Sequence, residues 1–209
     1  MKNIVVSAIL TLALIFTGCN KQNNDLKKIP LKDNEYDISS VNSPINPYNL
    51  DEYMFRKDIQ YVDLRSPRMI LEEGYVAGFE FIPFYSIIGS FTSDRTLYRM
   101  KSVGNVSPGE VGGFIAQYEE SERIIKELFN QDKPIFFISQ AGSESGYVIN
   151  LLLQLGYDGN LLYNVGGVSN SEGVASYKSI TTNKYYVAGP GNFDVVTTYN
   201  FVDRLTPIK

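Results

Sequence analysis

The chain has 209 residues, which is enough for one ordinary domain with extensions. Of these residues 44% are hydrophobic and 20% charged, a composition that is inconsistent with wholesale disorder, collagen or a coiled coil. Its net charge of -4 leaves no basic surplus, so we expect no binding to nucleic acid. The absence of histidine excludes Ser-His-Asp and Cys-His catalysis and every histidine-ligated metal site. The sole cysteine, Cys19, can form neither an internal disulfide nor a thiolate-metal cluster, and we expect no cofactor.

The amino terminus is typical of an export signal. Lys2 precedes an apolar stretch from Ile4 to Phe16, which is too short to span a bilayer comfortably. Phe16 to Cys19 (Phe-Thr-Gly-Cys) resembles the lipobox of bacterial lipoproteins, although Phe16 stands where that family usually has Leu. The resemblance implies a lipoprotein signal peptide over residues 1–19, with diacylglycerol on the Cys19 thiol and fatty acids such as palmitate. It implies a lipid anchor on the extracytoplasmic side of a membrane of the bacterial cell envelope. A simple secretory signal with an incidental cysteine is the alternative.

Residues 20–46 are rich in Asn, Lys, Asp and Ser, a composition that favours a polar tether between membrane and domain. An extra strand around Tyr36 to Ile38 is the alternative. The tether is expected to lead into an organised domain over residues 47–170.

The organised region begins with short elements. Asn49 is a candidate cap for a short helix through Phe55, and the apolar run 59–64 predicts a strand. Ser66 and Pro67 are typical of an N-cap and first helical position, and Gly74 of the end of that helix. Residues 79–82 predict a second strand, which Pro83 stops.

The second half of the domain repeats this alternation. Residues 90–113 predict no firm element, whereas Phe114, Tyr118, Ile125 and Phe129 recur at helical spacing. A strand over 135–138, a helix over 145–155 and a buried strand over 161–165 follow. Strands alternating with helices predict an α/β domain with a mostly parallel central sheet flanked by helices. Because ligands bind beyond the carboxyl ends of such strands, the segment after Ile138 is the candidate site.

Three segments in this order resemble a rhodanese-like domain, and the resemblance covers residues 47–170. Residues 61–67 (Tyr-Val-Asp-Leu-Arg-Ser-Pro) are similar to the family's Asp-Val-Arg strand end. Residues 73–79 (Glu-Gly-Tyr-Val-Ala-Gly-Phe) are similar to its Gly-His-Ile-x-Gly-Ala signature, with Tyr75 in the histidine's place and Phe79 in the alanine's. Residues 134–145 (Pro-Ile-Phe-Phe-Ile-Ser-Gln-Ala-Gly-Ser-Glu-Ser) resemble its last strand before the active-site loop and the loop itself.

The resemblance implies a degenerate active site. Active members begin this loop with a persulfide-carrying cysteine and usually hold an arginine five positions on, where this chain has Ser139 and Glu144. A hydroxyl cannot form the persulfide, and its proton is much harder to remove than that of a thiol. A Glu144 carboxylate about 6 Å from a bound anion would repel it by roughly 3 kcal/mol. This repulsion is avoided if the side chain points into solvent or interacts with the dipole of its own helix. The candidate binding residues are Ser139, Gln140, Ala141, Gly142, Ser143, Glu144 and Ser145.

The leading hypothesis is a membrane-anchored binding domain without sulfurtransferase activity, whose partner is an unknown protein or small molecule. The alternative is a serine-dependent enzyme with Ser139 as nucleophile and the loop N–H groups as oxyanion site, which lacks a histidine base and would need Lys126 or Lys133 nearby. A solute-capturing lipoprotein is disfavoured, because a single α/β unit has no second lobe to close over a solute. Asp63 and Arg65 are either ligand contacts or, as we favour, a local pair.

Residues 171–209 form a predicted β-rich carboxy-terminal extension. The runs 184–187 and 193–202 are β-prone and flank Gly189-Pro190-Gly191, so a hairpin is the simplest prediction. An isolated hairpin is marginal in water, so its aromatic side chains are expected to pack on the domain. A flexible end is the alternative.

Overall fold

The structure, a computed structural model, describes residues 26–101, 112–169, 175–189 and 204–208. The predicted signal peptide, Cys19 and the second run of the predicted hairpin, 193–202, lie outside these residues. Within the described part of the chain, no helix is long and apolar enough to cross a membrane.

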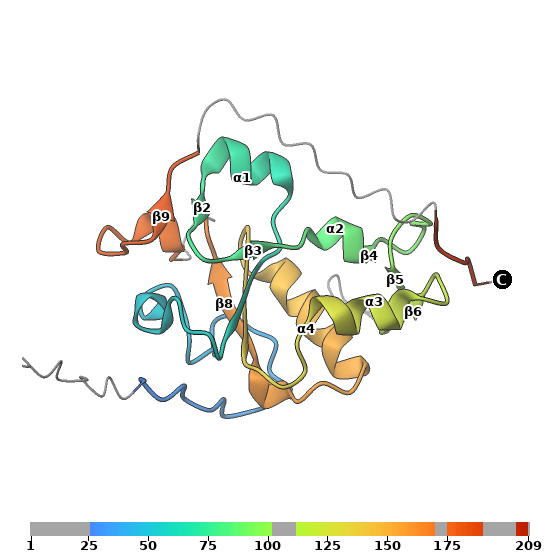
Figure 1. Cartoon of the computed structure of the whole chain (residues 1–209), viewed down its shortest axis with the longest axis horizontal. Helices are drawn as coiled ribbons and strands as arrows, with labels where there is room; N and C mark the ends of the chain where they lie inside the picture. The colour runs from blue at the N-terminus through green and yellow to red at the C-terminus, as the bar shows by residue number, and fades with distance from the viewer. Residues whose placement is uncertain (1–25, 102–111, 170–174, 190–203, 209) are drawn as a thin grey trace, which may run out of the picture.

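The centre of the molecule is a four-stranded parallel sheet (Figure 1). Its strands are β1 (Gln60–Asp63), β3 (Glu80–Phe81), β7 (Ile135–Ser139) and β8 (Leu162–Gly167), in the order β3-β1-β7-β8. Each of them coincides with a predicted strand, which confirms the α/β fold with a parallel central sheet. The carboxyl end of β7 therefore lies between the ends of β1 and β8.

Four α-helices accompany the sheet: α1 (Pro67–Glu73), α2 (Phe84–Ile87), α3 (Ser121–Leu128) and α4 (Ser143–Gln154). Helix α1 begins as predicted, because the Ser66 side chain accepts a hydrogen bond from the Met69 N–H and Pro67 occupies the first position. It ends at Gly74, whose φ of +88° suits glycine. A Cβ there would also lie 2.2 Å from the Val187 carbonyl oxygen, so no larger residue fits.

The two faces of the sheet are covered differently. Val62, Ile135, Phe137 and Leu162 face a core that α3 and α4 complete. Alternate residues of the same strands, among them Phe136 and Tyr163, face a second core. That second core is completed by η1 (Leu50–Tyr53), by residues before it and by η3 (Tyr177–Ser179) and its neighbours. The predicted flanking by helices is therefore correct for one face, whereas irregular segments and short 3₁₀ helices cover the other.

A separate three-stranded sheet corrects one prediction. It consists of β4 (Ile88–Gly89), β5 (Tyr98–Met100) and β6 (Phe114–Ala116), of which β5 lies in the segment 90–113 that has no predicted element. Phe114 and Tyr118 are buried in the first core, but from a strand and the turn after it, and α3 begins only at Ser121. The Gln154 side-chain amide makes hydrogen bonds with both the backbone N–H and the backbone C=O of Phe114, groups that would bond to other backbone groups in a helix. Tertiary contacts thus override the helical spacing.

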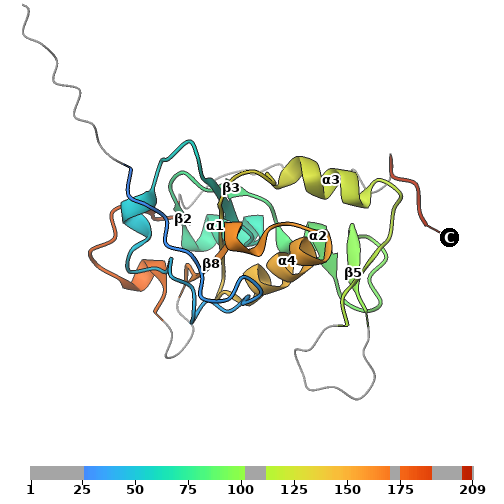
Figure 2. The same ribbon diagram turned by 90° about the horizontal axis from the view of Figure 1, so that it is seen from below.

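The predicted tether is shorter than residues 20–46, because the chain already packs on the domain well before residue 47. Ile45 is fully buried and Ile38 packs against the first core. The Tyr163 hydroxyl donates a hydrogen bond to the Pro30 carbonyl, and the Asn164 amide to that of Ile38. Figure 2 shows this segment, in blue, against the folded body. It is irregular throughout, so the extra strand does not form.

Two parts of the carboxy-terminal extension lie on the domain, at opposite ends of Figure 1. Strand β9 (Tyr186–Val187) pairs antiparallel with β2 (Tyr75–Val76), and the preceding Tyr177 is buried in the second core. Residues 204–208 run along the end of β6, where Glu119 N–H donates to the Thr206 carbonyl. In the first run of the predicted hairpin, Tyr185 and Tyr186 pack against the second core, and β9 has β2 as a strand partner.

Candidate functional site: the loop after strand β7

Ser139 is the last residue of β7 and is completely buried. Its Oγ accepts a hydrogen bond of 2.9 Å from the Gly142 N–H, and its carbonyl oxygen accepts one of 3.0 Å from the Val168 N–H. The hydroxyl therefore closes the turn between strand and helix. A buried oxygen held in this way does not present a nucleophile to a substrate.

Gly142 caps helix α4 with a φ of +93°, which favours glycine. A Cβ at this position would lie 3.0 Å from the Ser40 Oγ and 3.3 Å from the Gly166 Cα. The Gly142 carbonyl oxygen accepts a 2.9 Å hydrogen bond from the side-chain amide of Asn164, which lies on β8. Strand β8 has one additional residue, Val165, beside the step from Phe137 to Ile138. The loop thus rests on β8 and on the amino-terminal segment.

Three of the predicted site residues, Ser143, Glu144 and Ser145, lie in the first turn of α4. Its first N–H groups have no partner within the helix, as at every helix start, and they carry a partial positive charge. Ser143 is exposed and donates a 3.2 Å hydrogen bond to the half-buried Glu144 carboxylate. Ser145 is fully buried, and its Oγ has no hydrogen-bond partner among the described residues. Glu144 makes no hydrogen bond to Ser139 within this part of the chain.

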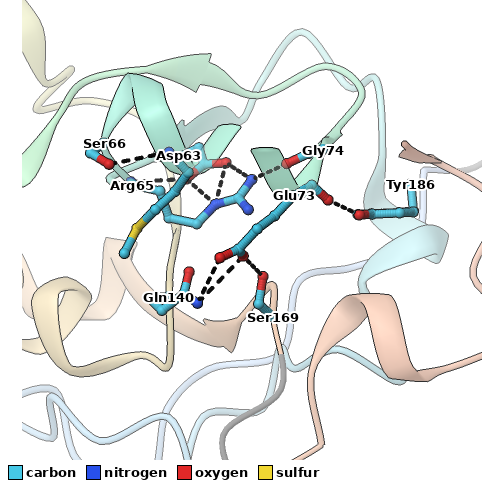
Figure 3. A network of polar contacts seen from close by, with 9 residues as sticks. Asp63, Arg65, Ser66, Glu73, Gly74, Gln140, Ser169 and Tyr186 are labelled. Carbon is cyan, nitrogen blue, oxygen red and sulfur yellow. Dashed lines mark hydrogen bonds and ion pairs between the residues drawn. The ribbon is translucent and has the colours of Figure 1, made fainter. Parts of the chain in front are cut away.

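Glu73 connects the loop to its surroundings (Figure 3). Its carboxylate accepts hydrogen bonds from the Gln140 amide, at 3.4 Å to both oxygens, and from the Ser169 hydroxyl. Its backbone carbonyl accepts the Tyr186 hydroxyl, so a residue of the carboxy-terminal extension reaches the same network. This role of Glu73 was not predicted from the sequence. A signal was available, because a glutamate in the last turn of a helix opposes the dipole and needs another partner.

Asp63 and Arg65 form a completely buried ion pair beside this network (Figure 3). The Arg65 Nη2 lies 2.7 Å from the Asp63 carboxylate and 2.9 Å from the Gly74 carbonyl, and Nε donates to both carboxylate oxygens. This confirms the predicted local pairing. The Arg65 Nη1 and the Gln140 Oε1 are buried without a hydrogen-bond partner among the described residues. The pair links the end of β1 to the end of α1.

The serine-enzyme alternative gains no support from this geometry. The Lys126 ammonium pairs with Glu122, and the Lys133 ammonium donates to the Lys57 carbonyl, so neither serves as a base for Ser139. No group of three or more Asp, Glu, His or Cys side chains that could hold a metal ion occurs in the described ranges.

Comparison with protein families, with characterised proteins and with solved structures gives no match for this chain.

Proposed function

We propose that the chain is a membrane-anchored lipoprotein whose rhodanese-like domain binds a ligand or a protein without sulfurtransferase activity. The observation that carries the proposal is the state of Ser139. It stands where the resembling family has its persulfide cysteine, it is fully buried, and its Oγ accepts the Gly142 N–H. Sulfur transfer needs a thiolate that becomes a persulfide, and a hydroxyl forms none.

A binding role is supported by the way the loop is fixed. Three hydrogen bonds hold the loop. The Ser139 hydroxyl accepts the Gly142 N–H, and the Asn164 amide donates to the Gly142 carbonyl. The Glu73 carboxylate accepts the Gln140 amide. Binding to a fixed loop costs less conformational entropy than ordering a mobile one. The exposed Ser143 lies at the start of α4 and is the natural contact point for a partner.

The anchor rests on the lipobox resemblance at Cys19. The first described residue that packs on the second core is Ile29, ten residues after Cys19. Ten residues of extended chain span at most roughly 35 Å, so a diacylglycerol on Cys19 would keep the domain within that distance of a membrane. Partners of the loop are therefore expected among membrane or envelope components.

Site-specific photo-crosslinking in intact cells tests the binding role. A photoreactive amino acid is placed at Ser143 after the carboxyl end of β7 or, as a matched control, at the exposed Asp132 in the turn before the amino end of that strand. We expect a discrete adduct from position 143 that is weaker or absent from position 132. Gly142→Val, which distorts the loop, should remove the adduct.

Equal adduct patterns from both positions, or no adduct from position 143, would contradict a role for the loop in binding. Retention of the adduct in a folded Gly142→Val variant would do the same. Folding of each variant is checked by circular dichroism and thermal unfolding before the comparison is made.

A further inference from the structure

A polar cavity lies apart from the loop, between the amino-terminal segment and strand β8. It has a volume of about 260 Å³. Its lining includes Lys32, Asp33, Asp37, Ser39, Asn42, Ser43 and Asn164. All but Asn164 belong to the segment for which the sequence predicted a tether. The cavity is larger than a single water needs and slightly smaller than typical sites for drug-sized molecules.

Two lining residues have buried polar atoms without a partner. Asn164 is 4% exposed, and its Nδ2 donates to the carbonyls of Ile38, at 2.8 Å, and of Gly142, at 2.9 Å. These two acceptors fix the orientation of the amide, because the reversed amide would place an oxygen against them. The Oδ1 then needs a donor and has none among the described residues. Ser43 is 8% exposed, and its Oγ is likewise without a partner.

Two of the three charged groups of the lining, Asp37 and Lys32, are engaged, whereas the Asp33 carboxylate has no hydrogen bond or ion pair among the described residues. The Asp37 carboxylate accepts the Ser39 N–H at 2.8 Å and the Asn42 amide at 2.7 Å, and these bonds lower the pKa of Asp37. The Lys32 ammonium donates to the carbonyls of Glu35 and Gly159, which leaves one of its three N–H groups. Burial lowers the pKa of Lys32, although the nearby carboxylates oppose that shift.

This lining restricts the chemistry of an occupant. Phosphate or sulfate would meet the Asp37 carboxylate and offers little to donate to the Asn164 Oδ1. A metal cation would share the cavity with the Lys32 ammonium and would find a single unengaged carboxylate, Asp33, because N–H donors occupy the Asp37 oxygens. An apolar molecule would leave the Ser43 and Asn164 atoms unpartnered, which costs free energy. A neutral molecule with several hydroxyl groups both donates and accepts, and it satisfies each of these groups.

We propose that this cavity binds a neutral polyhydroxylated small molecule of about monosaccharide size. The site goes beyond the proposed function of the Ser139 loop and does not depend on it. The cavity and the Ser139 loop are joined through Asn164. This residue lines the cavity, and its amide donates a hydrogen bond to the Gly142 carbonyl of the loop, so an occupant of the cavity stabilises that contact.

The test is calorimetric titration of the full-length purified protein with D-glucose, D-galactose, D-mannose and myo-inositol, with inorganic sulfate in parallel. The variants are Ser43→Ala, which removes an unpartnered hydroxyl and should not lower the melting temperature, and Asn42→Ala on the cavity rim. Ser90→Ala, an exposed serine outside the cavity, is the matched control. We expect at least one polyol to bind and sulfate not to bind. Affinity should fall about tenfold or more in Ser43→Ala and stay unchanged in Ser90→Ala.

Failure of all four polyols to bind would overturn the proposal, as would preferential binding of sulfate. Binding that both Ser43→Ala and Asn42→Ala leave unchanged would also overturn it, because it would place the polyol elsewhere. If Ser43→Ala does not fold, Asn42→Ala decides alone. Photo-crosslinking at Ser143 is independent of these titrations, so failure of this site and failure of the loop's binding role are told apart.

Discussion

At the end of β7, a single hydroxyl replaces the sulfur that the resembling family uses for chemistry. Ser139 is buried and accepts the Gly142 N–H, so its role in this structure is to shape the loop. The sequence identified Ser139 and its six successors as the site, because an apolar strand led into small residues and a helix. Glu73 could not be found in this way, since its contacts to Gln140 and Ser169 join residues that are far apart in sequence.

Replacing Ser139 with alanine tests its structural role. The Gly142 N–H would lose its acceptor inside the protein, so we expect the free energy of unfolding to fall by about 1–3 kcal/mol. The matched control is Ser143→Ala at the exposed start of α4, with a change within about 0.5 kcal/mol. Urea denaturation measures both. Equal stability of Ser139→Ala and the wild type would show that this hydrogen bond contributes nothing.

The buried Asp63–Arg65 pair permits a larger effect. Arg65→Met leaves the Asp63 carboxylate buried without its cation, so we expect a loss of about 3–5 kcal/mol. The double variant Asp63→Leu with Arg65→Met removes both charges and should recover part of this loss. Denaturant titration of the three proteins tests the pair. A loss below about 1 kcal/mol in Arg65→Met would mean that Asp63 is not desolvated as described.

At the scale of elements, predictability depends on how local the determining contacts are. Helix α1 was predictable because Ser66, Pro67 and Gly74 set its ends through short-range contacts. Strand β7 was predictable because four consecutive apolar residues suit a strand that is covered on both faces. The strand at Phe114 was not, since β5 and the Gln154 side chain hold it. The packing of residues 29–46 depends similarly on distant residues of β8.

The docking of residues 204–208 beside β6 should depend on pH. The Glu120 carboxylate accepts the Thr206 N–H at 3.0 Å and the Thr206 hydroxyl at 2.9 Å, and these bonds lower the pKa of Glu120. A lowered pKa in the docked state means that docking is favoured above the ordinary glutamate pKa. This contribution is lost as the pH falls through the lowered pKa.

The Thr206 amide proton resonance reports this transition. We expect it to move toward the position of an undocked peptide on acidification, with a midpoint below that of an ordinary glutamate. In Glu120→Gln the same resonance should be independent of pH over this range. A midpoint at or above the ordinary value in the wild type would contradict the contact.

At the scale of the whole molecule, the proposal joins a lipid anchor to one α/β domain. Metabolic labelling with an alkyne fatty acid should tag the wild type and leave Cys19→Ser untagged. Cys19→Ser should also leave the membrane fraction, because the single cysteine is the only attachment point in the proposal. Equal labelling of both proteins, or release of the wild type as a soluble secreted protein, would disprove the anchor.

We propose that the domain transfers no sulfur, and a thiosulfate:cyanide assay of the purified domain is the sharpest test of that proposal. We expect no thiocyanate above a heat-killed control from the wild type. Ser139→Cys alone should gain little, whereas Ser139→Cys with Glu144→Arg should gain more, because the added cation favours the anionic substrate. Equal rates for these two variants would show that Glu144 does not face the bound anion. Thiocyanate formation by the wild type that Ser139→Ala abolishes would contradict the claim.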